Sequence, residues 1–370
     1  MEQILQDFLD LVQIDAASRD ERAVADAVRA KMEALGMTVE EDRAGDTFGG
    51  ITGNLFAVVD GGLPGSLLLN SHLDRVAGGL GIKPQIRDGM VASDGTTILA
   101  ADDLSGVCAI LDGVRRVKAS GKPFPRLEIL FTVGEEAGLF GSKAFDKSRL
   151  QAKMGFVFDS PGPVGRVVIA TPARATLVCE VFGKGAHAGS CPEKGINAVT
   201  ALAKILATIR DGRLDSESTA NFAILETGSK SPNAVQHYAK VTGETRSLSH
   251  QKLKDYMAYF EKHCREAVEG TGATVKTEMT PSFGNFRLTE DAHAVRIARK
   301  AMEKMGLSIL AEAGGGGMDA DIFNAAGIQC IGVATGYSGN HSRGETLSLK
   351  DFLQAGELAQ KLIETFAEDQ

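Results

Sequence analysis

Several features that would assign this chain to a common class of protein are missing from its 370 residues. Its net charge is −8 at pH 7, so it lacks the surplus of basic residues that binds nucleic acids and anionic membranes. No segment approaches the roughly 20 apolar residues of a membrane span. The chain also does not start with the basic and apolar regions of a signal peptide. We therefore expect neither nucleic acid nor a membrane as a partner.

The cysteines and glycines exclude two further kinds of site. The five cysteines are scattered and show no CxxC spacing, which is typical of reduced thiols in a cytoplasmic protein rather than of disulfides or metal ligands. The glycine run 314–317 is not part of a GxGxxG motif and is followed by no Walker lysine. A nucleotide-binding loop is therefore excluded there.

What the sequence does contain is a recurring unit, in which an apolar strand is followed by polar residues and then by a helix or a glycine-rich loop. Residues 67–71, 127–133 and 154–158 have the apolar content of buried parallel strands. Between about 171 and 283 the pattern changes to a β-α-β-β-α-β order, which is typical of a ferredoxin-like fold. Because 370 residues exceed one ordinary core, we predict two domains.

The predicted fold class is α/β. A discontinuous catalytic domain, residues 1–170 and 284–370, would contain a mostly parallel sheet with helices on both faces. Residues 171–283 would form an inserted ferredoxin-like α+β lid. Near the N-terminus, Ser18-Arg-Asp-Glu21 has the capping-box pattern and predicts a helix that opens there and closes at Gly36.

Five side chains that can bind metals lie at the predicted strand ends or in adjoining loops: His72, Asp102, Glu136, Asp159 and His341. Ligands of open α/β sheets bind at the carboxyl ends of the strands, so we expect these side chains to converge. Two imidazoles and three carboxylates without a thiolate suit Zn²⁺, Co²⁺ or Mn²⁺. Each residue alone also fits a surface turn or a helix cap. Their common position is what favours a metal site.

The five ligands divide evenly between two metal ions if one carboxylate bridges them. Counting alone leaves the bridging residue open, and Asp102, at the start of a predicted helix, is our first choice. Asp74 lies two residues after His72 on an extended segment and can fix the orientation of the imidazole. Glu135 has no metal in this count, and a free carboxylate beside a metal-bound water is what a hydrolytic general base requires.

The chain resembles the co-catalytic dizinc exopeptidases, a family that includes peptidase T, glutamate carboxypeptidase and succinyl-diaminopimelate desuccinylase. The motifs that carry the resemblance are Ser-His72-Leu-Asp74, Ala-Asp102-Asp103-Leu-Ser-Gly, Gly-Glu135-Glu136-Ala-Gly, Phe-Asp159, Gly-Lys-Gly-Ala-His187-Ala-Gly and Gly-Asn-His341. They occur in the family's order between about residues 54 and 350. Gly-Met-Asp-Ala-Asp-Ile-Phe-Asn, followed by Ala-Thr-Gly-Tyr, makes peptidase T and its relatives the nearest members.

The resemblance implies two metal ions per chain, most often zinc, held by His72, Asp102, Glu136, Asp159 and His341. It implies that Asp102 is the bridge and that the peptide bond between Asp102 and Asp103 is cis. It also implies that Glu135 is the general base and that Asp74 orients His72.

In the lid, the resemblance assigns a role to His187, which would stabilise the tetrahedral intermediate. The histidine would act either in its own chain or across a homodimer formed by the lid domains. Asn233 and Arg246 match substrate-binding positions, and Arg246 is suited to a bidentate grip on a carboxylate. A surface arginine at a strand end is an equally good interpretation of Arg246.

The expected activity is metal-dependent hydrolysis of amide bonds in small peptides, with removal of the N-terminal residue of tripeptides. Two metal ions would activate a water molecule, and Glu135 would take its proton and later protonate the leaving amine. One alternative is an N-acyl amino acid deacylase or carboxypeptidase of the same family. Another is a non-catalytic metal-binding regulatory module, against which the retained Glu135 argues. The sequence departs from the family pattern at Arg75, Leu104 and Glu244, which leaves the substrate more open than the chemistry.

Overall fold

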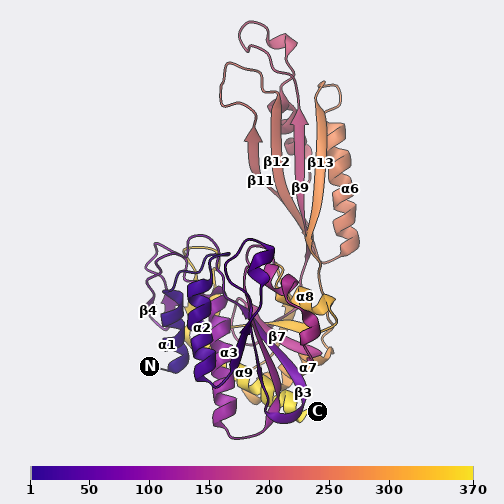
Figure 1. Ribbon diagram of the computed structural model, residues 1–370. Coiled ribbons are helices and arrows are strands. Elements are labelled where there is room, and N and C mark those ends of the chain that lie inside the picture. Colours follow the sequence, from indigo (N-terminus) through magenta and orange to yellow (C-terminus); the bar gives the residue numbers. More distant parts are fainter. Residues whose placement is uncertain (1, 370) are drawn as a thin grey trace. The chain divides into compact units, whose positions relative to one another are not determined.

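The chain folds into two compact units. The computed structural model describes residues 2–369. One unit, here called the discontinuous unit, contains residues 2–171 and 286–369, and the other, the inserted unit, contains residues 172–285 (Figure 1). Among the described residues, no helix combines the length and the apolar character that crossing a bilayer requires.

The discontinuous unit is built on an eight-stranded sheet with the order β1-β2-β6-β3-β7-β15-β8-β14. The strands are β1 (Thr38–Glu41), β2 (Leu55–Val59), β3 (Gly62–His72), β6 (Phe124–Thr132), β7 (Met154–Ser160), β8 (Arg166–Ala170), β14 (Leu310–Ala313) and β15 (Gln329–Ala334). The pairs β3–β6, β3–β7, β7–β15 and β8–β14 are parallel, and the other three neighbouring pairs are antiparallel. The expected, mostly parallel sheet is confirmed.

Helices cover both faces of this sheet, as predicted. On one face, the larger hydrophobic core includes residues of α1 (Gln3–Val12), α2 (Arg22–Ala34), α3 (Ala101–Ala119), α7 (His293–Lys304) and α9 (Leu349–Glu368). On the other face lie α8 (Asp319–Ala325) and, beside it, α4 (Phe140–Ala144). Successive residues of β3 alternate between the two cores: Leu67 and Leu69 belong to the first and Leu68 to the second.

Several short strands were not predicted. The strands β4 (Gln85–Arg87), β5 (Met90–Ala92), β16 (Tyr337–Ser338) and β17 (Thr346–Ser348) form a small sheet with the order β16-β17-β5-β4. Two or three residues are too few to show an alternating pattern, so only the folded chain reveals them. The loop between β16 and β17 contains His341.

The inserted unit has the expected ferredoxin-like order with one additional strand. It consists of β9 (Ala173–Phe182), α5 (Ala198–Thr208), β10 (Gly212–Asp215), β11 (Ser218–Thr227), β12 (Tyr238–Ser247), α6 (His250–Ala267) and β13 (Thr274–Phe283). The sheet is antiparallel, with the order β10-β11-β12-β9-β13. Every second residue of β9 from Ala173 to Val181 is buried, which leaves one face of the sheet for the helices. The unpredicted strand is β10.

The capping-box prediction is wrong. Helix α2 begins at Arg22, and its N-cap residue Glu21 makes no side-chain capping hydrogen bond. The hydroxyl of Ser18 instead donates to Oδ2 of Asp74, 2.5 Å away and 56 positions further along the chain. A capping box requires local hydrogen bonds, but the side chains of Ser18 and Glu21 bind distant parts of the fold.

Candidate metal centre

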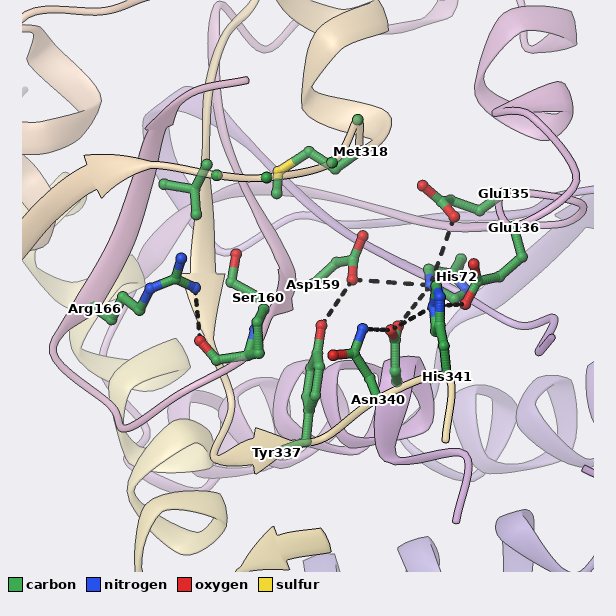
Figure 2. Close-up of a pocket in the computed structure, with 17 residues that line it drawn as sticks. His72, Glu135, Glu136, Asp159, Ser160, Arg166, Met318, Tyr337, Asn340 and His341 are labelled. Carbon is green, nitrogen blue, oxygen red and sulfur yellow. Dashed lines mark hydrogen bonds and ion pairs between the residues drawn. The ribbon is translucent and has the colours of Figure 1, made fainter. Parts of the chain in front are cut away.

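The predicted ligands come from strand ends at one edge of the large sheet. His72 is the last residue of β3, Glu136 follows the end of β6, and Asp159 is the next-to-last residue of β7. Asp102 lies at the start of α3 and His341 in the loop between β16 and β17. Because β3, β6 and β7 run parallel, their ends bring these side chains together. Figure 2 shows the labelled ligands His72, Glu136, Asp159 and His341 with their side chains turned toward one another.

The five side chains form two groups that share Asp102. Oδ1 of Asp102 lies 3.2 Å from Nε2 of His72, and Oδ2 lies 3.3 Å from Nε2 of His341. Ligand atoms of His72, Asp102 and Asp159 all lie within 4.8 Å of one another, as do those of Asp102, Glu136 and His341. This is the arrangement that two metal ions with one bridging carboxylate require. The assignment of these residues as ligands stays a prediction.

Glu135 lies close enough to the ligands that proximity alone does not separate a base from a ligand. Its Oε2 is 4.0 Å from Nε2 of His72, and ligand atoms of His72, Glu135 and Glu136 lie within 4.8 Å of one another. What distinguishes Glu135 is that it belongs to neither of the two groups that contain Asp102.

The electrostatics of the site favour a bound cation. His72, Asp102 and Glu135 have only 2%, 7% and 8% of their surface exposed. Burial raises the pKa of Glu135 and of Asp159 well above the usual range, and neighbouring carboxylates add to this effect. Clustered buried carboxylates are stable when positive charge compensates them. Oxygen and imidazole donors are those that Zn²⁺ and similar ions take, so the donor set fits two divalent metals.

The carboxylates around His341 also favour positive charge. Its Nε2 lies 2.9 Å from Oε1 of Glu136. Hydrogen bonds to Asp102 and Glu136 raise the pKa of His341 to about 10. A proton on this imidazole therefore supplies charge that a metal ion would supply instead, because a metal-binding histidine must be neutral.

Asp102 is fixed by backbone and side-chain contacts together. The peptide bond between Asp102 and Asp103 is cis, as the resemblance implies. Nδ2 of Asn340 donates to Oδ2 of Asp102 at 2.8 Å. The buried carboxylate of Glu345 accepts the backbone N–H groups of Leu99, Ala100 and Asp102 at 2.8–3.0 Å. Both the position of the backbone and the direction of the carboxylate are thereby set.

Gly106 allows α3 to start against the strand ends. A Cβ atom at this position would lie 2.1 Å from the backbone oxygen of Phe158 and 2.8 Å from Oγ of Ser71. Only glycine therefore fits where the first turns of α3 touch β3 and β7. This close approach places Asp102, four residues earlier, at the edge of the sheet.

Asp74, the predicted partner of His72, also contacts the turn that contains Glu135 and Glu136. Nδ1 of His72 lies 3.0 Å from the backbone oxygen of Asp74 and 3.5 Å from its carboxylate Oδ1. The carboxylate of Asp74 accepts the backbone N–H groups of Glu135 at 2.9 Å and Glu136 at 3.2 Å. Asp74 therefore contacts the imidazole mainly through its carbonyl and the Glu-Glu turn through its carboxylate.

Tyr337, Asn340 and Arg166 are polar residues of the site that the sequence did not predict. The hydroxyl of Tyr337 donates to Oδ1 of Asp159 at 3.1 Å, Asn340 donates to Asp102, and Arg166 lines the cavity beside the ligands. Tyr337 ends the Ala-Thr-Gly-Tyr motif and Asn340 precedes His341, so the sequence held a signal for both. Arg166 stands in no motif.

A cavity of about 280 Å³ opens beside the ligands, close to the lower end of the size range of small-molecule sites. The side chains of His72, Glu136 and His341 lie on one side of Asp159 and Ser160, and the guanidinium of Arg166 lies on the other (Figure 2). Nη1 of Arg166 donates to the backbone oxygen of Pro161 at 2.7 Å, and its Nε pairs with Glu312. The lining also includes Val168, the glycine run 314–317, Met318 and Tyr337.

The other three predicted site residues belong to the inserted unit and do not all lie together. Asn233 is beside His187, because its backbone oxygen accepts the N–H group of Ala188 at 2.9 Å. Arg246 lies near the end of β12, where its Nε donates to Glu244 at 2.7 Å. Asn233 instead precedes the start of β12 at Tyr238, and His187 pairs with Ala234 in the same segment.

The exposed imidazole of His187 has a defined tautomer when neutral. Its Nδ1 accepts the backbone N–H groups of Gly189 at 3.2 Å and Ser190 at 3.1 Å. The ring hydrogen therefore sits on Nε2, which points away from these contacts and can donate a hydrogen bond.

Comparison with known proteins places these features in a family context. A family model described as a peptidase dimerisation domain matches residues 169–271, and the model of peptidase family M28 matches residues 54–187. Over 365 residues the chain is 34% identical to the YqjE protein of Bacillus subtilis, with 98% of each chain covered.

Solved structures match the chain along nearly its whole length. The aminopeptidase PepT of Bacillus cereus is 35% identical, with a TM-score of 0.89, and a tripeptidase of Staphylococcus aureus is 30% identical, with a TM-score of 0.93. Each match covers 99% of this chain and 98% of the other.

Proposed function

Because this chain belongs to the peptidase T family of metal-dependent exopeptidases, we propose that it removes the N-terminal residue of short peptides, above all tripeptides. The motif resemblance is thus confirmed, and peptide hydrolysis is favoured over the deacylase alternative. The observation that supports the proposal best is the pair of ligand groups that share Asp102, with Glu135 beside them and outside both.

In the proposed reaction, His72, Asp102 and Asp159 would hold one divalent ion and Asp102, Glu136 and His341 the other, with zinc the first candidate. Bound ions of this kind lower the pKa of a water molecule and polarise a carbonyl group. Glu135 takes a proton from the water molecule whose oxygen attacks the scissile carbonyl carbon, and returns that proton to the leaving amine as the C–N bond breaks. The carboxylate of Asp74 accepts the backbone N–H groups of Glu135 and Glu136 and so holds the carboxylate of Glu135 within reach of the substrate.

The small substrate fits the size and charge of the cavity. A cavity of about 280 Å³ suits a short peptide better than a folded protein. The free carboxylate of such a peptide has two candidate partners, Arg166 in the cavity and Arg246 of the inserted unit. Asn233, beside His187, is proposed to hold the peptide backbone, since an amide side chain both donates and accepts hydrogen bonds.

The dimensions of the inserted unit support a homodimer in which His187 acts across the interface. From Tyr238 to Arg246, β12 spans eight residue steps, which is about 26 Å at about 3.3 Å per residue. A tripeptide extends over about 10 Å at most. The start of β12, near His187, and Arg246 are therefore further apart than a tripeptide extends. If both act on one substrate, His187 of the partner subunit completes the site.

An open strand edge gives the dimer a surface. Strand β11 pairs with β12 along its length but with β10 only at residues 218–220. On the unpaired part, Ile224 is 56% and Leu225 61% exposed. Open apolar strand edges favour pairing with another chain. The segment lies within the match to the peptidase dimerisation domain, which also supports this interface.

The state of the cysteines supports a cytoplasmic location of the protein. All five are free thiols, four of them buried. Thiols persist in reducing compartments, whereas secreted proteins commonly pair them.

The test of the proposed function combines metal content with a substrate panel. Gently purified protein should contain close to two divalent ions per chain, and loss of activity after chelation should be reversed by Zn²⁺, Co²⁺ or Mn²⁺. Tripeptides should be cleaved at the first peptide bond faster than dipeptides, N-blocked tripeptides and N-acyl amino acids. Protein that contains no metal and keeps its activity in chelator would overturn the metal assignment. Preferred cleavage of N-acyl amino acids or of the last peptide bond would overturn the substrate assignment.

A further inference from the structure

Three consecutive backbone N–H groups in front of the metal centre are each held by a buried carboxylate. The N–H group of Gly134 donates to Oε1 of Glu21 at 3.1 Å. Those of Glu135 and Glu136 donate to the two carboxylate oxygens of Asp74 at 2.9 and 3.2 Å. The turn that presents the proposed base and a proposed ligand is thus anchored by two acids that come from distant parts of the chain.

A shorter polar N-cap residue would suffice at position 21 if the residue there served only to start a helix. Glu21 is the N-cap residue of α2, but its side chain makes no capping hydrogen bond. Its side chain is fully buried. Oε1 also accepts the N–H group of Arg19 at 3.0 Å, and Oε2 has no hydrogen-bond partner among the described residues. Burying a carboxylate is unfavourable, so the structure retains Glu21 for its contact with the turn.

The second acid is held by the same N-terminal segment. Ser18 donates its hydroxyl to Oδ2 of Asp74 at 2.5 Å. Oδ2 is the oxygen that accepts the N–H group of Glu136. The segment 18–21 therefore contacts the turn twice, directly through Glu21 and through Asp74 by way of Ser18.

The turn needs such anchors because it gives two adjacent glutamates different directions. Gly134 has a φ of +61°, a conformation that favours glycine. A Cβ atom there would lie 2.7 Å from the ring of Phe48, which stacks on Phe140. Rotation of the peptide planes after Gly134 would move the carboxylates of Glu135 and Glu136 together. A shift of about 1 Å in a reacting group can lower a rate by about 100-fold.

We infer that Glu21 is a positioning residue for peptide hydrolysis: its carboxylate fixes the Gly134 amide and, with Ser18 and Asp74, aims the base Glu135 relative to the ligand Glu136. The inference rests on the proposed roles of these two glutamates. Glu21 touches neither the cavity nor the ligand atoms, so it acts through the backbone of the turn.

The test compares Glu21→Ala, Glu21→Gln and Ser18→Ala with variants of a matched residue, Glu128. Glu128 is also fully buried, accepts the backbone N–H groups of Gln151 at 2.9 Å and Ala152 at 3.0 Å, and lies on β6 before its end. The measurements are kcat and KM for a tripeptide, metal content per chain, and the melting temperature.

Glu21→Ala should lower kcat by up to about 100-fold, with KM and metal content near those of the wild type. Glu21→Gln should restore kcat to within a few-fold, because its amide oxygen can accept the same hydrogen bond. Ser18→Ala should lower kcat less than Glu21→Ala. Glu128→Ala should lower the melting temperature and leave kcat unchanged.

The inference is wrong if Glu21→Ala and Ser18→Ala keep the wild-type kcat, or if Glu21→Gln is as impaired as Glu21→Ala. It is also wrong if Glu128→Ala lowers kcat as much as Glu21→Ala does at the same loss of melting temperature. If Glu21→Ala does not fold, Ser18→Ala and Glu21→Gln decide the question by the same criteria. A wild-type protein without peptidase activity would instead overturn the proposed function, independently of these variants.

Discussion

The two units of the chain hold their proposed functional residues in opposite ways. In the discontinuous unit, Asp102 is buried and receives a hydrogen bond from Asn340, while its backbone is tied to Glu345. In the inserted unit, His187 is exposed and its imidazole accepts two hydrogen bonds from its own loop. Buried, doubly held groups suit the reaction chemistry, which tolerates little displacement, whereas exposed groups suit contacts with a substrate or a second subunit.

The largest expected effect lies in the discontinuous unit and separates two adjacent residues. Glu135→Gln should lower kcat by on the order of 10²–10⁴ or more, as expected for loss of a general base, while both metal ions remain bound. Glu136→Gln should in addition weaken the binding of one metal, because Glu136 shares a ligand group with Asp102 and His341. Elemental analysis and steady-state kinetics of each variant make the comparison.

The control for this pair is Glu357, which is partly exposed on α9 and belongs to none of the ligand groups. Glu357→Gln should change neither metal content nor kcat. If Glu135→Gln and Glu136→Gln both bind metal normally and differ little in rate, the roles assigned to the two residues are wrong.

A smaller loss is expected from the exposed histidine of the inserted unit. Loss of one hydrogen-bond donor to an oxyanion typically lowers kcat by about 10²–10³, so His187→Ala should lower kcat by that amount. KM, metal content and melting temperature should stay near those of the wild type, since the side chain is exposed. Kinetics of His187→Ala beside His250→Ala, an exposed histidine at the start of α6, check this expectation.

Mixing His187→Ala with Glu135→Gln under subunit exchange locates the histidine. If His187 serves the partner subunit, mixed dimers contain one site with both wild-type residues and regain activity. Mixtures that stay inactive, although exchange is shown by labelled subunits, place the histidine in its own chain. A His187→Ala protein with undiminished kcat would remove the inserted unit from the chemistry.

The contrast between the units also explains what could be predicted from the sequence. The parallel strands and the ferredoxin-like insert have periodic apolar patterns, and His72, Glu136 and Asp159 follow strand ends that those patterns mark. Local motifs also pointed to Asp102 and His341. These signals are all contained within a few neighbouring residues.

What the sequence could not reveal were contacts between distant segments. Glu345 binds the backbone around Asp102 across more than 240 positions, and Glu21 binds Gly134 across 113. The Ser18–Glu21 pattern even favoured a wrong local interpretation, because a capping box and a tertiary anchor use the same residue types. Strands as short as β4 and β16 have too few residues for any periodic signal.

The smallest predicted effect compares one tyrosine from each unit. Tyr337 is buried and donates its hydroxyl to Oδ1 of Asp159 at 3.1 Å. Tyr238, in the inserted unit, donates to Oε1 of Glu180 at 2.8 Å. Partners of metal ligands typically contribute about 10- to 100-fold in metal affinity, so Tyr337→Phe should weaken one metal site by about 10-fold.

At saturating metal, Tyr337→Phe should recover most of the wild-type kcat, because Asp159 keeps its place beside His72 once an ion compensates its charge. Tyr238→Phe removes a hydroxyl from a shorter hydrogen bond but should leave metal affinity and kcat unchanged. Competition with a metal-binding dye measures both affinities. Equal affinities in Tyr337→Phe and the wild type would mean that the hydroxyl does not support Asp159 as a ligand. A weakened metal site in Tyr238→Phe would contradict the division of roles between the units. In that division the discontinuous unit holds the reacting groups, and the inserted unit contacts the substrate or a second subunit.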